Sequence, residues 1–233
     1  MTILKRLRFL ILMVFATLMY SGSASAACTP ISSVPFAITA PGQYCVTNDL
    51  QSSGAAGIQI SISTGNVTLD LNGFALKCTA SQNAIMGTLT MFNVTVKNGT
   101  IRDCNYAVTL SNCTSCTVQD IRAINNAAGI QVSGFAARVE HNQIRNDNAL
   151  AGNPAILVEA TSSLIDNNHI SGSNVGIMNR SKGNIIRGNT FGICNTAIRF
   201  DAGATYQNNL TQLCTTAFTG AGLASSVNAG GNF

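Results

Sequence analysis

The stretch 128–144, AGIQVSGFAARVEHNQI, contains three short strands in succession. The run 129–132 alternates apolar and polar residues, and Val139 is the apolar centre of a second strand between two charged residues. A third strand is centred on Ile144, two residues after Asn142. Alternation over so few positions is typical of half-buried strands.

The same unit recurs along the chain at intervals of 20 to 27 residues. The counterparts of Val139 are Leu69, Val96, Val118, Ile165, Ile186, Tyr206 and Val227. The position of Asn142 is taken in the other copies by Asn72, Gly99, Ile121, Asn168, Asn189, Asn209 and Gly230. The first strand is marked in eight copies by a small residue before an apolar one: Gly57-Ile58, Ala84-Ile85, Ala107-Val108, Gly129-Ile130, Ala155-Ile156, Gly176-Ile177, Ala197-Ile198 and Ala217-Phe218. A fixed period in the low twenties predicts a solenoid.

In such a solenoid, each coil of three short strands and three turns stacks on the next. Because stacked strands lie about 4.8 Å apart, eight coils predict a rod of roughly 35–40 Å. Asparagines stacked at a tight turn can hydrogen-bond along the stack through their side-chain amides, which satisfies groups that are costly to bury unpaired. The alternative is a β-sandwich with Asn-rich turns, but sandwich strands do not recur in register at this spacing.

Two segments carry a family resemblance. The run Gly57–Leu76, GIQISISTGNVTLDLNGFAL, followed by the Asn repeats, resembles right-handed parallel β-helix proteins of the pectate-lyase-like superfamily. The run Pro35–Leu50, PFAITAPGQYCVTNDL, is similar to the entry strands of secreted members. The resemblance implies an all-β fold, a right-handed single-stranded parallel β-helix of about eight coils. It implies no single activity, since the superfamily includes lyases, hydrolases, epimerases and non-catalytic scaffolds.

The chain divides into three expected parts: a signal peptide over 1–26, entry or capping strands over 27–56, and the β-helix domain over 57–233. A basic start precedes the apolar core Phe9–Tyr20, which is short for a membrane span, and Ala24-Ser25-Ala26 is a small-x-small cleavage site. These features predict a secreted or periplasmic protein with no membrane span. A lipid anchor on Cys28 is the competing interpretation, although the usual Leu three residues before the Cys is missing.

The nearly balanced charge of the chain argues against nucleic acid as a partner. Without the three basic residues of the signal peptide, ten Lys and Arg face nine Asp and Glu, and no basic run suggests nucleic acid. Trp is absent, so any aromatic platform for a sugar has to come from Tyr or Phe. We expect no metal and no cofactor.

All eight cysteines follow the expected cleavage site, which in a secreted chain indicates disulfides. Cys78 and Cys104 fall at nearly equivalent positions of adjacent coils, and so do Cys194 and Cys214. Residues at stacked positions of adjacent coils are close enough to form a disulfide. Cys28–Cys45 would tie down the entry segment, and Cys113–Cys116 remain by elimination. The spacing of this last pair is also that of a redox pair or half a metal site, and these alternatives stay open.

Candidate binding residues lie on the outward side of the first strands. Glu159, Arg180 and Asp201 form a ladder on successive coils, with Arg199 close by. The longest loop, Arg145–Asn153, borders the same side, and loops on a rigid scaffold often carry binding groups. We therefore expect any cleft, and a polysaccharide, beside these strands. The alternative is that the charges only neutralise one another across strands.

The second strands carry their own outward ladder, composed of Asp70, Lys97, Gln119, Glu140, Asp166, Arg187 and Gln207. Glu140 and Asp166 fall on adjacent coils, and paired carboxylates can perform glycoside acid/base chemistry or bind Ca²⁺. Arg187 follows in the ladder, so a structural ion pair with Asp166 is the simpler interpretation. His141 and His169 flank turns one coil apart and are expected to be ordinary turn residues.

Two function classes stay open. Ca²⁺-dependent pectate lyases have a cluster of acidic residues, of which few counterparts occur here. The sequence lacks the Asp-Asp and Gly-His-Gly motifs of polygalacturonase-like enzymes. It also lacks the Asp-Pro-His-Asp motif of alginate epimerases. The sequence therefore favours a secreted β-helix that binds polysaccharide or serves as an extracellular scaffold. The alternative is a polysaccharide-active lyase, hydrolase or epimerase whose catalytic residues the sequence does not identify.

Overall fold

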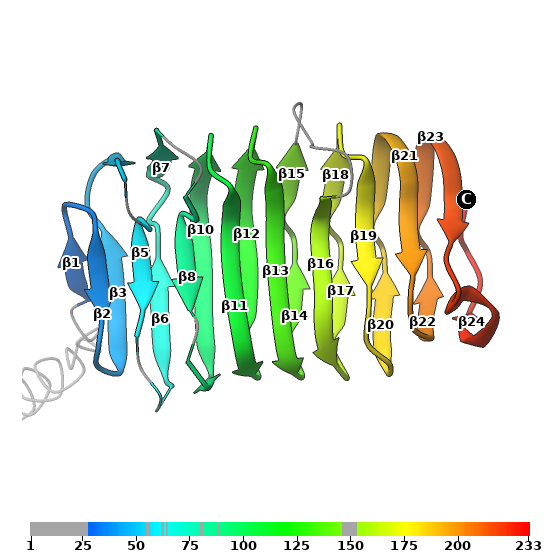
Figure 1. Ribbon diagram of the computed structural model, residues 1–233, viewed down its shortest axis with the longest axis horizontal. Coiled ribbons are helices and arrows are strands. Elements are labelled where there is room, and N and C mark those ends of the chain that lie inside the picture. The colour runs from blue at the N-terminus through cyan, green and yellow to red at the C-terminus, as the bar shows by residue number, and fades with distance from the viewer. Residues whose placement is uncertain are drawn as a thin grey trace, which may run out of the picture.

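The computed structural model describes residues 28–145, except 55, 62, 64, 80, 81 and 88, and residues 153–233. Figure 1 shows a rod in which each coil of the chain lies beside the next, from the entry strands at one end to β24 at the other. The rod is built from parallel strands, with one short 3₁₀ turn, η1, at Leu223–Ser225. The expected signal peptide and its cleavage site lie outside the described residues.

Three parallel sheets run along the rod. The first-strand sheet consists of β2 (Phe36–Ile38), β5 (Ile58–Ile60), β8 (Ile85–Gly87), β9 (Met91–Phe92), β11 (Tyr106–Thr114), β13 (Ala128–Phe135), β16 (Pro154–Thr161), β19 (Val175–Asn179) and the second halves of β21 (Thr190–Phe200) and β23 (Leu210–Thr219). The second-strand sheet consists of β1 (Thr29–Ile31), β3 (Gly42–Val46), β6 (Val67–Asp70), the first halves of β10 (Val94–Arg102) and β12 (Thr117–Ile124), β14 (Arg138–Glu140), β17 (Leu164–Asp166), β20 (Asn184–Arg187), β22 (Ala204–Gln207) and β24 (Val227–Asn228). The third-strand sheet consists of β4 (Leu50–Ser52), β7 (Ala75–Cys78), the second halves of β10 and β12, β15 (Gln143–Arg145), β18 (His169–Ser171) and the first halves of β21 and β23.

The observed register confirms the predicted columns over most of the rod. Val139 pairs with Val118 on one side and with Ile165 on the other, and the first-strand column runs unbroken from Ile58 to Phe218. These inward side chains, apart from Phe218 at the end of the column, are almost completely buried because each packs on its counterparts in the coils above and below.

In the last coil, the observed register differs from the predicted one. Tyr206 pairs with Asn228, and Val227 pairs one residue earlier with Thr205. The Asn column likewise ends at Asn232, which accepts a hydrogen bond from Asn209, and not at Gly230. The 3₁₀ turn before β24 has no counterpart in the other coils, so the predicted alignment is one residue out at Val227 and two residues out at Gly230.

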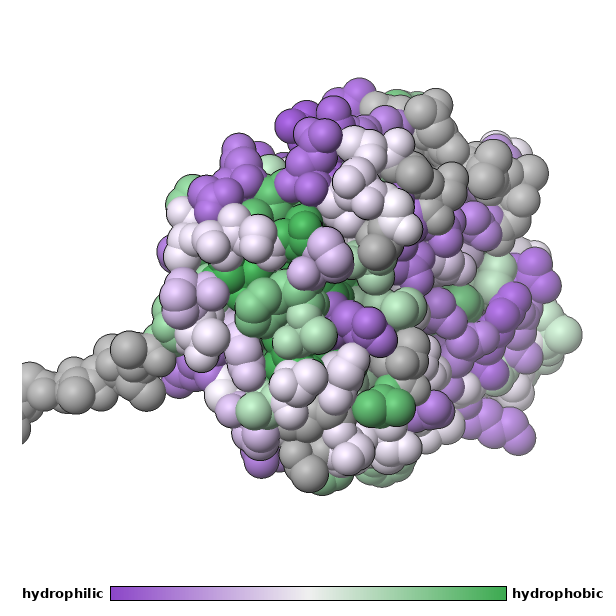
Figure 2. Space-filling view, turned by 60° about the vertical axis from the view of Figure 1, so that its left-hand side comes forward, coloured by the Kyte–Doolittle hydropathy of each residue, from purple (hydrophilic) through white to green (hydrophobic). Residues whose placement is uncertain are grey.

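The entry segment stacks on the rod as well. β2 pairs with β5, β3 pairs with β6, and β4 pairs with β7, so strands within 27–56 continue the three sheets. Figure 2 turns this end toward the viewer, and apolar residues gather in its middle within a polar rim. Val34 and Phe36, near this end, pack partly buried against the core.

Left-handed residues make the bends between strands. Before the third strands the φ angles are +53° at Asn72, +57° at His141, +52° at Asn167 and +52° at Asn208. Asparagine tolerates this region better than most residues, which explains why the coil bends are rich in Asn. Asn72 lies at this bend, so its predicted alignment with Asn142 is wrong: this coil has a longer turn, and buried Leu71 stacks on Gly99 in that column.

Four disulfides join the pairs that the sequence analysis expected. The Cα–Cα distances are 5.7 Å for Cys28–Cys45, 4.9 Å for Cys78–Cys104, 5.9 Å for Cys113–Cys116 and 4.4 Å for Cys194–Cys214. The sulfur of Cys28 is bonded to that of Cys45. Within the described ranges, no helix has the length and hydropathy needed to cross a membrane.

Candidate functional site

The four candidate residues on the first-strand sheet lie in one connected network. Arg180 Nη1 donates to Glu159 Oε1 at 3.0 Å, and Arg180 Nε lies 3.7 Å from Asp201 Oδ2. Arg199 Nε donates to the other oxygen of Asp201 at 2.8 Å. Gln131, which the sequence analysis did not select, donates from Nε2 to Glu159 Oε2 at 2.9 Å. We call these five residues the first-strand network.

The network is open to solvent. The side chains of Arg180 and Arg199 are 48% and 47% exposed, and those of Glu159 and Asp201 are 32% and 28% exposed. Two acidic and two basic groups give the network no net formal charge. It therefore presents fixed donors and acceptors to solvent and does not form a strongly charged patch.

A buried asparagine fixes the turn that carries Arg180. Asn179 is fully buried in a column where the adjacent coils place Val158 and Phe200. Its amide donates to the carbonyl oxygens of Ser181 and Ala202, and its oxygen accepts from Asn184 Nδ2. Asn179 thus ties down the backbone on both sides of Arg180. Because it interrupts an apolar column, the repeat pattern alone gave no reason to assign it a role.

Apolar residues flank the network. Phe135 is 51% exposed and follows two residues after Ser133, the register partner of Glu159. Leu157 and Met178 project from the same sheet yet are only 6% and 4% exposed, and they form a small apolar cluster with Val175 apart from the main core. The open part of this face is therefore polar, with the exposed ring of Phe135 at its edge.

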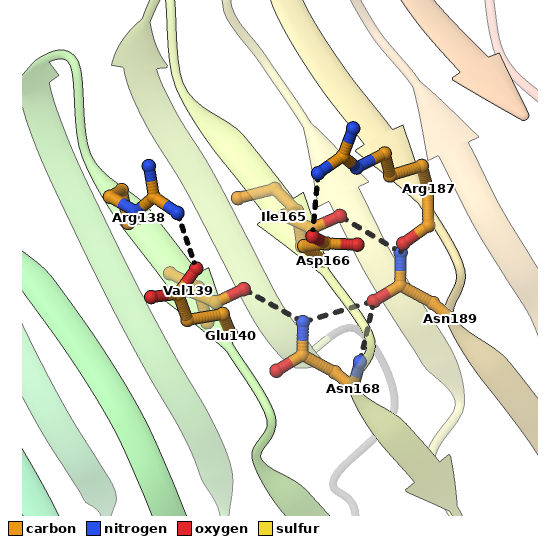
Figure 3. Close-up of polar contacts among 8 residues, drawn as sticks. All are labelled: Arg138, Val139, Glu140, Ile165, Asp166, Asn168, Arg187 and Asn189. Atoms are coloured by element: carbon orange, nitrogen blue, oxygen red, sulfur yellow. Dashed lines mark hydrogen bonds and ion pairs between the residues drawn. The ribbon is translucent and has the colours of Figure 1, made fainter.

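The second-strand ladder is held by ion pairs, as Figure 3 shows. Arg187 Nη2 donates to Asp166 Oδ2 at 3.0 Å, and Arg138 Nη2 donates to Glu140 Oε2 at 2.8 Å. The hydrogen bond to Asp166 and the charge of that carboxylate raise the pKa of the Arg187 guanidinium above its ordinary value. The guanidinium therefore stays charged throughout the ordinary pH range.

These ion pairs bear on the possible chemistry of Glu140 and Asp166. The two carboxyl groups are register partners on adjacent strands, and their side chains are only 13% and 10% exposed. Acid/base glycoside chemistry requires one carboxyl group that holds a proton for the leaving oxygen. Here each carboxyl group accepts a hydrogen bond from its own arginine, which favours the structural ion pair.

A hollow opens on the second-strand side of the rod, although the sequence analysis expected a cleft beside the first strands. It measures about 310 Å³ and is lined by Asp166, Asn167, Arg187, Gly188, Gln207 and Asn208. Its signal in the sequence was a single glycine at a bend position, and glycine alone does not distinguish a hollow from an ordinary turn. Residues 146–152 of the long loop lie outside the described residues, so a cleft beside that loop stays a prediction.

The match to a family model supports the fold assignment. No curated protein matches the sequence. A solved structure of ORF18 from Geobacillus virus E2 is similar at 15% sequence identity and a TM-score of 0.38, over 82% of this chain and 52% of that one. The family model described as "Right handed beta helix region" matches residues 43–191 and 88–228. The two matches overlap and together cover most of the described coils, and the chain belongs to the right-handed β-helix family.

Proposed function

We propose that this protein is secreted and binds polysaccharide through the first-strand network, with no catalytic step of its own. The observation that carries the proposal is the convergence of Gln131, Glu159, Arg180, Asp201 and Arg199 into one exposed hydrogen-bonded set. Four disulfides suit an oxidising compartment, which supports export.

The chemistry of the network suits sugar hydroxyl groups. A guanidinium offers several N–H donors in one plane, and carboxylates accept hydrogen bonds from hydroxyl groups. Because strand pairing and Asn179 hold the backbone around Arg180, little conformational freedom is lost when a ligand binds. The ring of Phe135 adds an apolar surface on which the C–H face of a sugar can pack.

The rod also suits a long ligand. Coils repeat at about 4.8 Å, so a chain molecule lying along the first-strand sheet meets similar backbone positions at every coil. The network spans four successive coils, those of Gln131, Glu159, Arg180 and Asp201. A polymer can therefore contact several rungs at once, whereas a monosaccharide contacts one or two.

Binding of the purified chain to an array of neutral and acidic polysaccharides tests this proposal, and Arg180→Ala is the key variant. The substitution should weaken binding to the retained glycan by about 1–3 kcal/mol, the cost of losing a charged hydrogen-bonding partner. Thermal stability should change little, because exposed ion pairs contribute about 0–1 kcal/mol.

Arg138→Ala is the matched control. Arg138 is 53% exposed and forms a similar ion pair at 2.8 Å, but on the second-strand sheet. It should leave glycan retention intact. If no polysaccharide is retained by the parent protein, or if both variants retain it equally well, the first-strand network serves only strand pairing.

A further inference from the structure

The hollow on the second-strand side is built by three successive coils. Each coil contributes the last residue of its second strand together with the bend residue that follows: Asp166 and Asn167, Arg187 and Gly188, Gln207 and Asn208. The strands that carry these residues are paired in register, so the lining is held by the sheet itself. The hollow is thus a fixed feature of the rod surface and needs no rearrangement to form.

Gly188 is the lining residue at the bend of the middle coil. It has φ +64°, while the adjacent coils place Asn167 and Asn208 at the same bend with φ +52°. Because Asn adopts this conformation on both sides, the backbone alone does not require glycine here. A Cβ at position 188 would clash with Asn167 Oδ1 and lie 3.3 Å from Asp166 Oδ1. Glycine at this position therefore leaves room for the Asn167 amide, which lies against it in the lining of the hollow.

The lining groups are mixed donors and acceptors of nearly balanced charge. Asp166 neutralises Arg187 across 3.0 Å, and the adjacent Glu140 is neutralised by Arg138 across 2.8 Å. The Arg187 side chain is 45% exposed, and a guanidinium has five N–H donors, of which this ion pair occupies only part. The amides of Asn167, Gln207 and Asn208 each add donors and an acceptor.

We propose that this hollow is a second carbohydrate site, which takes one or two neutral sugar units. A hydroxyl group both donates and accepts, and so matches amides, a guanidinium edge and a carboxylate edge in one place. An acidic sugar gains little here, because Asp166 already balances the charge of Arg187. The site lies on a different sheet from the first-strand network, so a protein with both sites could hold two polysaccharide strands together.

Titration of the ¹⁵N-labelled protein with methyl glycosides of glucose, galactose and mannose tests the proposal, and galacturonate is the acidic comparison. At least one neutral glycoside should shift the backbone amide signals of Gly188, Gln207 and Asn208. Gly188→Asn introduces the residue that both adjacent coils use, and its side chain must displace the Asn167 amide in the lining, so the affinity should fall at least about tenfold. Gln207→Ala should weaken binding as well and serves if Gly188→Asn does not fold.

Gly183→Asn is the control, because a Cβ at this left-handed glycine meets nothing closer than Ser162 Oγ at 3.6 Å. It should bind the glycoside like the parent protein. Arg180→Ala should leave these amide shifts unchanged, which separates this site from the proposed function. No shift with any neutral glycoside, equal binding by Gly188→Asn, or a stronger response to galacturonate would each overturn the proposal.

Discussion

Asparagine recurs inside the bend before the third strands because its side chain can satisfy four hydrogen bonds there. Asn168 Nδ2 donates to the carbonyl oxygen of Val139 at 2.8 Å and to Asn189 Oδ1 at 2.9 Å (Figure 3). Its Oδ1 accepts from both the backbone N–H and the side-chain amide of Asn142 at 3.0 Å. The same pattern continues through Asn189 and Asn209, so one residue type replaces the backbone pairing that the bend interrupts.

Asn168→Ala should therefore be costly. Asn168 is 1% exposed, and its removal leaves the N–H of Asn142 and the carbonyl of Val139 buried without these partners. At about 1–3 kcal/mol for each unsatisfied group, we expect the free energy of unfolding to fall by about 3 kcal/mol or more in urea denaturation. Asn195→Ala, at an exposed Asn that donates to Asn174, should cost under about 0.5 kcal/mol. Equal losses in the two variants would contradict the role of the buried stack.

At the scale of the element, the turns between third and first strands are less uniform. Asp103, Asn125 and Gly172 take positive φ at this turn in three coils, as expected for residues that tolerate the left-handed region. Ile193 and Leu213 take φ +52° and +55° in the last two such turns. They are also 65% and 82% exposed, so burial of their side chains does not offset the strain.

Ile193→Asn should stabilise the protein. The left-handed conformation costs an ordinary L-residue about 1–2 kcal/mol, and Asn recovers part of that through local hydrogen bonding. We expect a gain of about 0.5–1 kcal/mol in the free energy of unfolding, measured by thermal and urea denaturation. Ile185→Asn, at an exposed isoleucine within β20, lacks positive φ and should instead lose stability slightly. A loss at position 193 would mean that Ile193 makes a favourable contact outweighing its strain.

The elements differ in how far the sequence could predict them. The columns of Val139 and Ile130 were predictable because a buried side chain must repeat at every coil, which leaves a strict pattern. The last coil was predicted one to two residues out of register, since a 3₁₀ turn has no counterpart in the repeat. The ladder Glu159, Arg180 and Asp201 followed from the same register, whereas Gln131 and Asn179 join it through side-chain geometry that spacing does not encode.

At the scale of the whole molecule, the disulfides that join different coils lie toward the two ends, whereas Cys113–Cys116 lies within one coil. Cys28–Cys45 and Cys78–Cys104 join coils near the N-terminal end, and Cys194–Cys214 joins β21 to β23 near the C-terminal end. The sequence has no cysteine between positions 117 and 193. In a solenoid each coil contacts only its neighbours, so a coil near an end has less support than one in the middle. The disulfides thus reinforce the coils that would otherwise open first.

Hydrogen exchange on the intact and the reduced protein tests this arrangement. With the disulfides intact, amides of β13 and β16 should exchange most slowly, since they are paired on both sides and carry a fully buried apolar column. After reduction, amides of β3, β21 and β23 should exchange about 30-fold faster or more, which corresponds to about 2 kcal/mol of lost stabilisation. Amides of β13 should change far less, because no bridge joins that coil to its neighbours.

A variant with Cys194→Ser and Cys214→Ser, in which the other disulfides stay oxidised, distinguishes the effects of the bridges at the two ends. Exchange should accelerate in β21 and β23 and stay unchanged in β3, because local opening at one end of a one-dimensional stack need not spread through the middle. If exchange instead rises equally along the whole rod, the coils unfold as one cooperative unit. The disulfides would then act by constraining the unfolded chain as a whole, and their placement near the ends would have no local effect on opening.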